Sequence, residues 1–342
     1  MRQLRAKVEG AYYHATSRCA FQTFAFEAES KDMFVKIMRR AEAFSGVRIA
    51  NYCIMDNHFH ILVKVPVPKP VDDAELDRRI AILYGDSKSP SIFKRWEELE
   101  KSGGGAIVKR ERDAYRARMY DISQFMKTLK QRFSLWYTTH HGNLEGSIWQ
   151  GRFHSTLVEG SASALSAVSA YIDLNSVRAN ITREAKNYAW CGYAAAAKGD
   201  AKAREGIAGI FAEGVGIENR DKAKSRNEAW RLYSQMLACR RDNADAVIEG
   251  KSDAAVKHVA VAAKDGNREA SAIVAKMLAV REGKLSRGLV FGSPKYVDEI
   301  IARFRDVATT RTCIIVYGTS GGTMLCCTGR RERDNDDMGA IG

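Results

Sequence analysis

Two histidines separated by a single residue, His58 and His60, are the side chains of this sequence best suited to share a metal ion. They lie in an apolar run over 58–65 that is typical of a strand. Side chains alternate between faces along a strand, so both imidazoles point to one side, with their Cα atoms about 6.5–7 Å apart. Neutral imidazole is the commonest protein metal ligand. The alternative is a hydrogen-bonded pair at the edge of the core. Asp56 and Asn57 directly precede the pair as candidate partners for it.

A tyrosine and an asparagine form a second candidate pair. Tyr171 and Asn175 are four residues apart in a helical pattern over about 163–177, so they share one helix face. A phenol can act as a covalent nucleophile, but with an ordinary pKa near 10 it needs help from a metal or a base. An amide oxygen suits a hard divalent ion. The alternative is a surface tyrosine with an asparagine near a helix end.

The elements that must position these residues alternate between strand and helix. Aromatic and β-branched runs predict strands, and apolar spacing of three or four predicts helices. The order is strand, helix, strand, strand, helix, strand, helix, over residues 11–19, 31–44, 47–55, 58–65, 121–140, 147–158 and 163–177. This order favours an α+β fold with an antiparallel sheet and packed helices.

The rest of the chain divides by composition. Within a first domain, 1–198, residues 69–120 form a highly charged, partly helical surface insertion. Residues 194–199 are a low-complexity hinge, and 199–310 form a mostly helical extension, with helices predicted near 222–248, 252–263, 267–281 and 296–305. Residues 311–342 are rich in Gly and Thr and end in a charged run, which predicts a disordered tail.

The net charge points to a polyanion. The 342 residues carry 54 Lys+Arg against 41 Asp+Glu, a formal net charge of +13. This excess favours nucleic acid as a partner, although it also serves solubility. No apolar run approaches the roughly 18 residues that span a bilayer, and no apolar leader follows the basic N-terminus. Seven scattered cysteines without a C-x-x-C motif favour reduced thiols in a cytoplasm over a disulfide framework or a zinc ribbon.

Several blocks, in order along the chain, together resemble one protein family. The blocks are Tyr13–Arg18, Ile54–Leu62, Gln124–Phe133, Ile148–Phe153, Tyr171–Arg178 and Tyr188–Tyr193. Over residues 1–198 they resemble the single-tyrosine HUH transposases, and more narrowly the REP-associated tyrosine transposases. The resemblance implies an HUH, ferredoxin-like palm. Residues 286–305 look like the C-terminal extension of the longer members.

The resemblance implies a role for each residue of the two pairs. His58 and His60 match the paired histidines of the family, and Tyr171 matches its nucleophile. Asn175 matches the polar residue that often serves as a third metal ligand, and the ion would be Mg²⁺ or Mn²⁺. This chain departs from the family in two ways. It has Asn175-Ser176 where the family often has Asn-Pro, and its insertion over residues 69–120 is longer than a compact member of the family would need.

The activity implied by the resemblance is that of a metal-dependent single-stranded DNA endonuclease and strand transferase. It would act beside REP-like hairpins through a 5′-phosphotyrosine intermediate, in a bacterial cytoplasm near the nucleoid, as a monomer or a homodimer. Phosphate charge and base stacking would dominate DNA contact. We expect DNA contacts from Lys127, Lys130, Arg132, Trp149 and Arg152. A solvated helix face and a core tryptophan are the alternatives.

Two other functions compete with this interpretation. A domesticated, non-catalytic DNA-binding protein would keep the fold, but loss of at least one of the four paired residues would then be expected. A zinc hydrolase would need a further strong ligand such as Cys or Glu near His58 and His60, and none is obvious locally.

Overall fold

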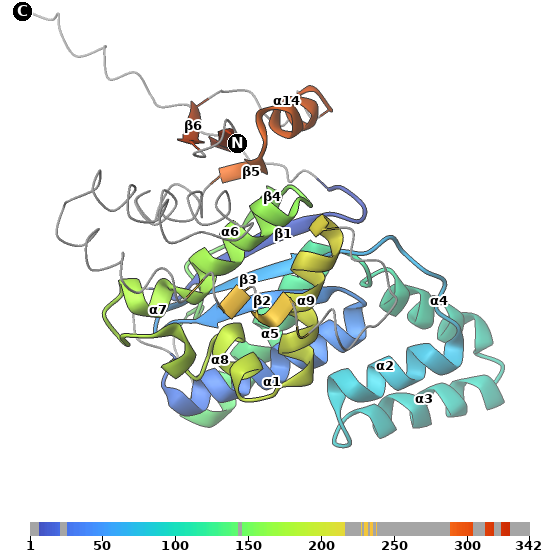
Figure 1. Ribbon diagram of the computed structural model, residues 1–342. Coiled ribbons are helices and arrows are strands. Elements are labelled where there is room, and N and C mark those ends of the chain that lie inside the picture. Colours follow the sequence, from blue (N-terminus) through green and yellow to red (C-terminus); the bar gives the residue numbers. More distant parts are fainter. Residues whose placement is uncertain are drawn as a thin grey trace, which may run out of the picture.

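The computed structural model describes residues 7–20, 26–142, 146–215, individual positions between 227 and 237, and residues 288–303, 312–317 and 323–328. Its framework is a seven-stranded sheet with the strand order β2-β3-β1-β4-β5-β7-β6. Helices lie on both faces of this sheet, and a further group of helices stands to one side (Figure 1). The predicted α+β fold is therefore confirmed. Among the described residues, no helix is long and apolar enough to cross a membrane.

The four strands nearest the candidate residues pair antiparallel, as the sequence predicts. They are β1 (Tyr12–Arg18), β2 (Arg48–Ile54), β3 (His58–Lys64) and β4 (His154–Val158). β1 is central and pairs with both β3 and β4. β4 is shorter than the predicted strand over 147–158, because the backbone turns at Gly151, whose φ of 101° lies in the left-handed region.

Alternation along the strands separates two cores. On one face, Tyr12 and Leu62 pack against α6 (Ala162–Asp173). On the other face, Tyr13, Phe59 and Ile61 pack against α1 (Ala28–Ser45) and α5 (Ile122–His141). The sheet is thus buried on both sides, and a polar side chain pointing to either face between its helices is held away from water.

Each of these three helices begins or ends at a residue suited to that position. Asp121 caps α5 by accepting from the Gln124 amide at 2.9 Å, and Ser161 caps α6 by accepting from the Ala164 amide. Gly46 ends α1 with a φ of 73°, where an added Cβ would meet the Tyr120 ring at 2.7 Å. A residue without a side chain is therefore required where α1 meets the insertion.

The predicted helix over 163–177 is broken. α6 ends at Asp173, and a short helix α7 (Asn175–Arg178) follows after Leu174. The Asn175 amide donates to the backbone oxygens of Tyr171 and Ile172, at 3.0 and 3.3 Å, at the end of the first helix. The side chain thus caps carbonyls that a continuing helix would use, which sets the break at this point.

The charged insertion forms three helices with a small core of their own. They are α2 (Asp73–Tyr84), α3 (Ser89–Lys101) and α4 (Gly105–Arg116), and they lie together beside the sheet (Figure 1). Their core is centred on Trp96, which is buried and donates from Nε1 to Glu111 at 2.7 Å. Phe44 of α1 also packs in this core, so the insertion is joined to a helix that covers the sheet.

The segment after α7 stays packed against β2. After a short 3-10 turn, η2 (Ala185–Asn187), α8 (Gly192–Ala197) buries alanines in the residues predicted as a hinge. α9 (Ala201–Val215) crosses β2 so closely that a Cβ at Gly206 would lie 2.6 Å from the Ala50 carbonyl. The proposed boundary near 198 therefore falls within packed structure, and the domain limits stay predictions.

Among its described residues, the C-terminal part adds strands β5, β6 and β7 and helix α14. β5 (Gly288–Gly292) pairs parallel with β4, and β7 (Thr323–Thr328) joins it to β6 (Thr312–Tyr317). α14 (Pro294–Arg303) follows β5. Two strands thus lie where the sequence predicted a disordered tail, because the apolar stretches within 312–328 can pair as a hairpin. The helices predicted over 252–263 and 267–281, and most of that over 222–248, lie outside the described residues.

Candidate functional site

The histidine pair lies where strand alternation predicts, on the face of the sheet covered by α6. His58 and His60 are 8% and 2% exposed. Their ring centroids are 5.1 Å apart. A third imidazole joins them from the neighbouring strand β1, because His14 points to the same face and is 1% exposed. The site is therefore a group of three buried histidines.

His14 holds His60. The His14 Nε2 and His60 Nδ1 atoms lie 2.9 Å apart, at hydrogen-bond distance, and the two rings stack with centroids 5.1 Å apart. The opposite nitrogen of His60, Nε2, is buried and has no hydrogen-bond partner among the described residues. A buried imidazole nitrogen without a partner is unfavourable unless a ligand satisfies it.

Asn57 contacts the Nδ1 atom of His58, as His14 contacts the Nδ1 atom of His60. The His58 Nδ1 atom lies 2.7 Å from the Asn57 side-chain oxygen, which can only accept, so Nδ1 carries the proton and Nε2 the lone pair. Asp56, the other candidate partner, instead pairs with Lys31 at 2.5 Å. Both histidines of the pair are thus anchored through Nδ1, the arrangement of imidazoles that bind metals through Nε2.

Burial keeps these imidazoles neutral. It lowers the pKa of His14 to about 3. Burial, followed by the charge of Arg18, lowers the pKa of His58 to about 4. Burial also holds the pKa of His60 well below its ordinary value, and neighbouring imidazoles and arginines add to the effect. At neutral pH all three rings can therefore offer lone pairs, as metal ligation requires.

Tyr171 stands on α6 directly above the histidines. Its ring meets those of His60 and His14 edge-on, with centroids 5.7 and 5.9 Å away, and the side chain is 1% exposed. Asn175 is 2% exposed, and its amide nitrogen is bonded to backbone oxygens, so the oxygen is the atom left for a ligand. Tyr171 therefore joins the histidine group, while Asn175 is tied to the end of the same helix.

A buried network fixes α6 on β2. Asp173, within the helix that carries Tyr171, accepts from the Asn51 amide at 2.7 Å and from the Tyr233 hydroxyl. Asn51 also donates to the Ser169 hydroxyl at 2.7 Å. Burial raises the pKa of Asp173 to about 6, although these donors lower it. The network holds the helix in one position and ties a residue of the C-terminal part to it.

Two arginines border the site. The Arg178 guanidinium lies 5.2 Å from the centre of the Tyr171 ring, and its Nη1 is buried without a hydrogen-bond partner among the described residues. Arg18 pairs in register with His58 across β1 and β3, and is exposed. Sequence reasoning assigned no role to these arginines or to His14, although all three lie within the blocks that carry the family resemblance. Only the strand register and the α6–α7 turn bring them to the site.

The residues predicted to contact DNA lie on and beside α5. Lys127 and Arg152 are exposed, and Arg132 is half-buried over the Tyr84 ring, 4.8 Å from its centre. Lys130 donates to the Gly151 carbonyl at 2.8 Å. Trp149 is 7% exposed, and its indole nitrogen donates to Ser134 at 2.8 Å. The tryptophan therefore packs as a core side chain, and base stacking on it would need its ring to be uncovered.

The described residues contain no group of three or more His, Cys, Asp or Glu side chains placed to hold one metal ion. His14 is turned so that its Nε2 faces Nδ1 of His60 rather than an ion. Of the three clustered histidines, His58 and His60 are thus the two whose Nε2 atoms are available to an ion, and a third ligand would have to be an amide such as Asn175.

Comparison with known proteins supports the resemblance. Residues 7–101 match the family model described as "Transposase IS200 like", a segment that contains His14, His58 and His60 and ends before Tyr171. The match confirms the resemblance to the tyrosine transposases. A solved structure, "Structure of the REP associates tyrosine transposase bound to a REP hairpin", is 13% identical, with a TM-score of 0.38 over 58% of this chain and 87% of that one. No curated protein matches the chain.

Proposed function

We propose that this chain, which carries the IS200-like transposase match over residues 7–101, cuts and rejoins single-stranded DNA through a covalent tyrosine intermediate. The observation that carries the proposal is the contact of the Tyr171 ring with two neutral, buried imidazoles, those of His60 and His14. A nucleophilic phenol beside groups able to hold a divalent ion is the set that phosphoryl transfer through tyrosine requires.

The side chains fit a divalent metal ion. His60 has a buried Nε2 atom without a hydrogen-bond partner among the described residues, and His58 is anchored by Asn57 so that its Nε2 carries a lone pair. The Asn175 oxygen is the third candidate ligand. Two imidazoles and an amide oxygen suit Mn²⁺ at least as well as Mg²⁺, which prefers oxygen ligands. A bound ion would polarise the scissile phosphate and stabilise charge in the transition state.

The covalent step follows from the position of Tyr171. Its hydroxyl loses a proton, and the oxygen bonds to the phosphorus of a DNA phosphodiester. The bond from phosphorus to the 3′-oxygen breaks, and that oxygen gains a proton to become a free 3′-OH. The protein then holds the 5′ end as a phosphotyrosine. Attack by another 3′-OH reverses these changes and rejoins the DNA without a separate energy source.

Arg178 and Arg18 supply positive charge to this reaction. The Arg178 guanidinium faces the Tyr171 ring at 5.2 Å, where it would favour the phenolate and the charge growing on the phosphate. Arg18 is exposed beside His58, where it can contact an incoming phosphate. The contact of Tyr171 with the histidines of its own chain supports a reaction within one copy of the chain, in which a homodimer is not needed to supply the nucleophile.

The DNA substrate is proposed from the resemblance and the charge. A single strand beside a REP-like hairpin is the substrate class of the branch that the sequence resembles. Lys127, Lys130, Arg132 and Arg152 would contact its phosphates, since these positive charges gather on and near α5. Trp149 contributes by packing beneath Lys130, whose ammonium lies 5.0 Å from the centre of its ring.

Trapping of the covalent intermediate tests the proposal. The wild-type protein is incubated with hairpin-bearing single-stranded DNA, labelled on the 3′ side of the expected cut, and Mn²⁺ or Mg²⁺. We expect a labelled protein–DNA adduct that resists denaturation and is absent from Tyr171→Phe. Tyr188→Phe, which removes another buried hydroxyl, is the matched control and should still form it. An adduct that persists in Tyr171→Phe would contradict the nucleophile assignment.

The alternative is a DNA-binding protein of the same fold without catalysis. It predicts that wild type and Tyr171→Phe bind hairpin DNA equally and that neither forms an adduct with any hairpin or metal. The anchoring of both His58 and His60 through Nδ1 favours the catalytic proposal, because a binding protein has no need to keep two buried imidazoles in this arrangement.

A further inference from the structure

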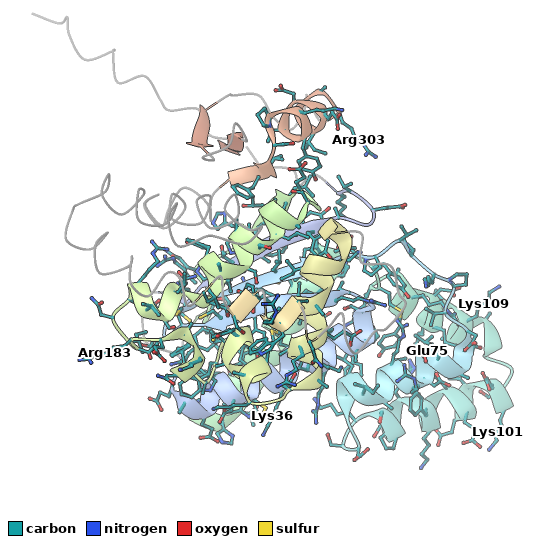
Figure 2. The ribbon with its side chains drawn as sticks, in the orientation of Figure 1. Lys36, Glu75, Lys101, Lys109, Arg183 and Arg303 are labelled. Carbon is teal, nitrogen blue, oxygen red and sulfur yellow. The ribbon has the colours of Figure 1, made fainter. Side chains whose placement is uncertain are left out.

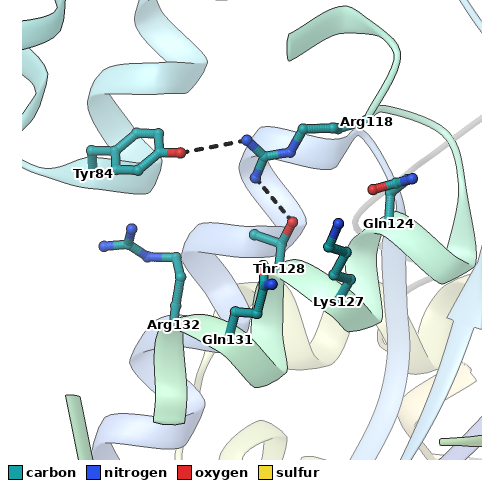
Figure 3. Close-up of a pocket in the computed structure, with 7 residues that line it drawn as sticks. All are labelled: Tyr84, Arg118, Gln124, Lys127, Thr128, Gln131 and Arg132. Carbon is teal, nitrogen blue, oxygen red and sulfur yellow. Dashed lines mark hydrogen bonds between the residues drawn. The ribbon is translucent and has the colours of Figure 1, made fainter. Parts of the chain in front are cut away.

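A polar cavity of about 260 Å³ lies between the insertion and α5. The insertion contributes Tyr84, at the end of α2, and Arg118, just after α4. From α5, Lys127, Gln131 and Arg132 point toward the same space (Figure 3). The cavity is on the α1 and α5 side of the sheet, whereas Tyr171 is on the α6 side. It is therefore separate from the candidate catalytic site.

Every side chain that lines the cavity can donate a hydrogen bond, and none is acidic. Three are cations, and the others are amides and hydroxyls, including Gln124 and Thr128. Arg, Lys, Gln, Thr and Tyr are the side chains that usually contact phosphate oxygens in protein–DNA interfaces. The lining thus has the chemistry of a phosphate site throughout.

Among the described residues, carboxylates do not balance the positive charge at the cavity. Elsewhere in the insertion, arginines contact carboxylates, as in the pairs Arg79–Glu75, Arg95–Glu111, Arg112–Asp77 and Arg116–Asp73. Within the described part of the chain, no carboxylate lies in salt-bridge distance of the three cavity cations. An anion bound at the cavity would therefore complement positive charge that no described carboxylate balances.

Neutral partners hold the cavity arginines in place. Arg118 donates to the Thr128 hydroxyl at 3.1 Å and to the Tyr84 hydroxyl at 3.4 Å (Figure 3). Arg132 lies over the Tyr84 ring. Burial lowers the pKa of Arg132, and the nearby charges of Arg40 and Arg118 add to this effect. The guanidinium groups are thus ordered and crowded, as expected of a site built to receive negative charge.

The size and accessibility of the cavity favour part of a polymer over a whole small molecule. Its volume is below the roughly 300–1,000 Å³ of typical small-molecule sites, whose walls are mostly apolar. Lys127 is exposed and Gln131 is exposed beside it, so the cavity can be reached from solvent along α5. A phosphate of an extended DNA backbone fits these conditions.

We propose that the insertion and α5 together form a binding site for a backbone phosphate of the DNA substrate, with Arg118, Lys127 and Arg132 as its cations. This inference rests on the proposed function and extends it. The DNA held here is a flanking segment, because the cavity and Tyr171 lie on opposite faces of the sheet. In this proposal the insertion contributes directly to DNA binding.

Binding measurements on two pairs of variants test the proposal. Lys127→Glu is compared with Lys109→Glu, an exposed lysine on α4 that is labelled in Figure 2 and is not among the residues that line the cavity. Arg118→Gln is compared with Arg110→Gln, an exposed arginine of α4. The affinity for labelled single-stranded DNA with a hairpin and single-stranded flanks is measured by fluorescence anisotropy at several salt concentrations. Thermal unfolding shows that each variant is folded.

We expect both cavity variants to bind about tenfold more weakly and the controls to change by about twofold or less. The slope of log affinity against log salt should fall by about 0.7–0.9 for each phosphate that the variant no longer binds. DNA without the flanks should bind equally to wild type and Lys127→Glu. Cavity variants that match their controls in affinity and slope would overturn the proposal.

The same samples separate this inference from the proposed function. Wild-type protein that binds DNA with the expected dependence on Lys127 and Arg118 but forms no adduct would support the cavity and contradict the catalytic proposal. Wild-type protein that forms the adduct while both cavity variants bind normally would overturn the cavity alone. No binding of DNA by wild type would overturn both.

Discussion

The two faces of the sheet treat polar side chains in opposite ways. On the α6 face, His14, His60 and Tyr171 are almost completely buried, and the histidines are held neutral. On the α5 face, Arg132 and Lys127 line a cavity that reaches the surface. The α6 face buries neutral imidazoles and a phenol, with Arg178 and Arg18 at the border of this group, whereas the cavity on the α5 face is lined by three cations.

The difference fits the two proposals, chemistry on the α6 face and DNA anchoring on the α5 face. Burial removes the charge from imidazoles, because desolvation disfavours the protonated form, and that leaves nitrogen atoms able to bind a metal ion. Arginines at a partly open cavity retain charge and can bind phosphates. Histidines with an ordinary pKa near 6.5 would be mostly uncharged at neutral pH, so they would bind phosphate more weakly than the arginines and the lysine of the cavity.

The largest effect is expected from removing both ligand imidazoles. The double variant His58→Ala and His60→Ala should lose adduct formation by at least about a thousandfold, since the activated phosphate is no longer provided. Isothermal titration with Mn²⁺ should show loss of the bound ion. Lys127→Ala is the control on the other face and should keep the heat of metal binding. Unchanged Mn²⁺ binding in the double variant would contradict the assignment of the metal site to His58 and His60 on the α6 face.

The insertion core should be energetically separate from the catalytic face. Trp96→Ala removes the centre of that core and should lower the free energy of unfolding by about 3–5 kcal/mol. The matched control Ile107→Ala, at a position 40% exposed on the same group of helices, should change it by about 0.5 kcal/mol or less. Chemical denaturation gives these values. Mn²⁺ binding by folded Trp96→Ala should equal that of wild type. Weaker Mn²⁺ binding by this variant would show that the insertion core and the site on the α6 face are energetically coupled.

Acid should destabilise the α6 face, which carries the candidate catalytic site. The folded-state pKa of His58, about 4, is below the ordinary value of 6.5, so the unfolded chain binds more protons between these values. The contribution of His58 to the free energy of unfolding is therefore fully present above about pH 6.5. It is lost as the pH falls toward 4, and the loss is about 3 kcal/mol. His14 acts in the same direction. Asp173, with a pKa raised to about 6, acts in the opposite direction and offsets part of the loss.

Unfolding free energies measured between neutral pH and about pH 5 check this expectation. His14→Gln should show a smaller dependence on pH than wild type, because one buried imidazole is gone. A stability that rises on acidification would mean that the carboxyl of Asp173 outweighs the histidines.

The smallest effect concerns His14, which contacts His60 and Tyr171. His14→Leu should weaken Mn²⁺ binding about 10–100-fold, because loss of a hydrogen-bond partner leaves a metal ligand poorly oriented. His14→Gln can still bond to His60 Nδ1 and should restore much of the affinity. Titration calorimetry without DNA measures this directly. Equal affinities for His14→Leu and wild type would limit His14 to packing.

Periodicity and spacing were sufficient for much of the site. The two-residue alternation of a strand placed His58 and His60 on one face, and the strands β1, β2 and β3 form close to their predicted bounds. Tyr171 was expected on a helix and lies on one. These features depend on local backbone geometry, which is repeated in every strand and helix.

Other features required contacts between distant segments. The strand predicted over 147–158 shortens because a glycine turns the chain, and the helix predicted over 163–177 breaks where Asn175 caps its end. Strands replace part of the predicted tail because β6 finds a partner in β7. Trp149, expected as a stacking platform, is packed into the core by neighbours from other elements.

The amino-acid sequence by itself determined the α+β class, the common face of the histidine pair and the excess of positive charge, because each depends on composition or on short-range periodicity. Tertiary structure alone decided that His14 supports His60, that Arg178 reaches Tyr171 and that Tyr84 and Arg118 meet α5. Those contacts depend on strand register and helix packing. Register joins residues 46 positions apart in the first case, and no local pattern encodes that separation.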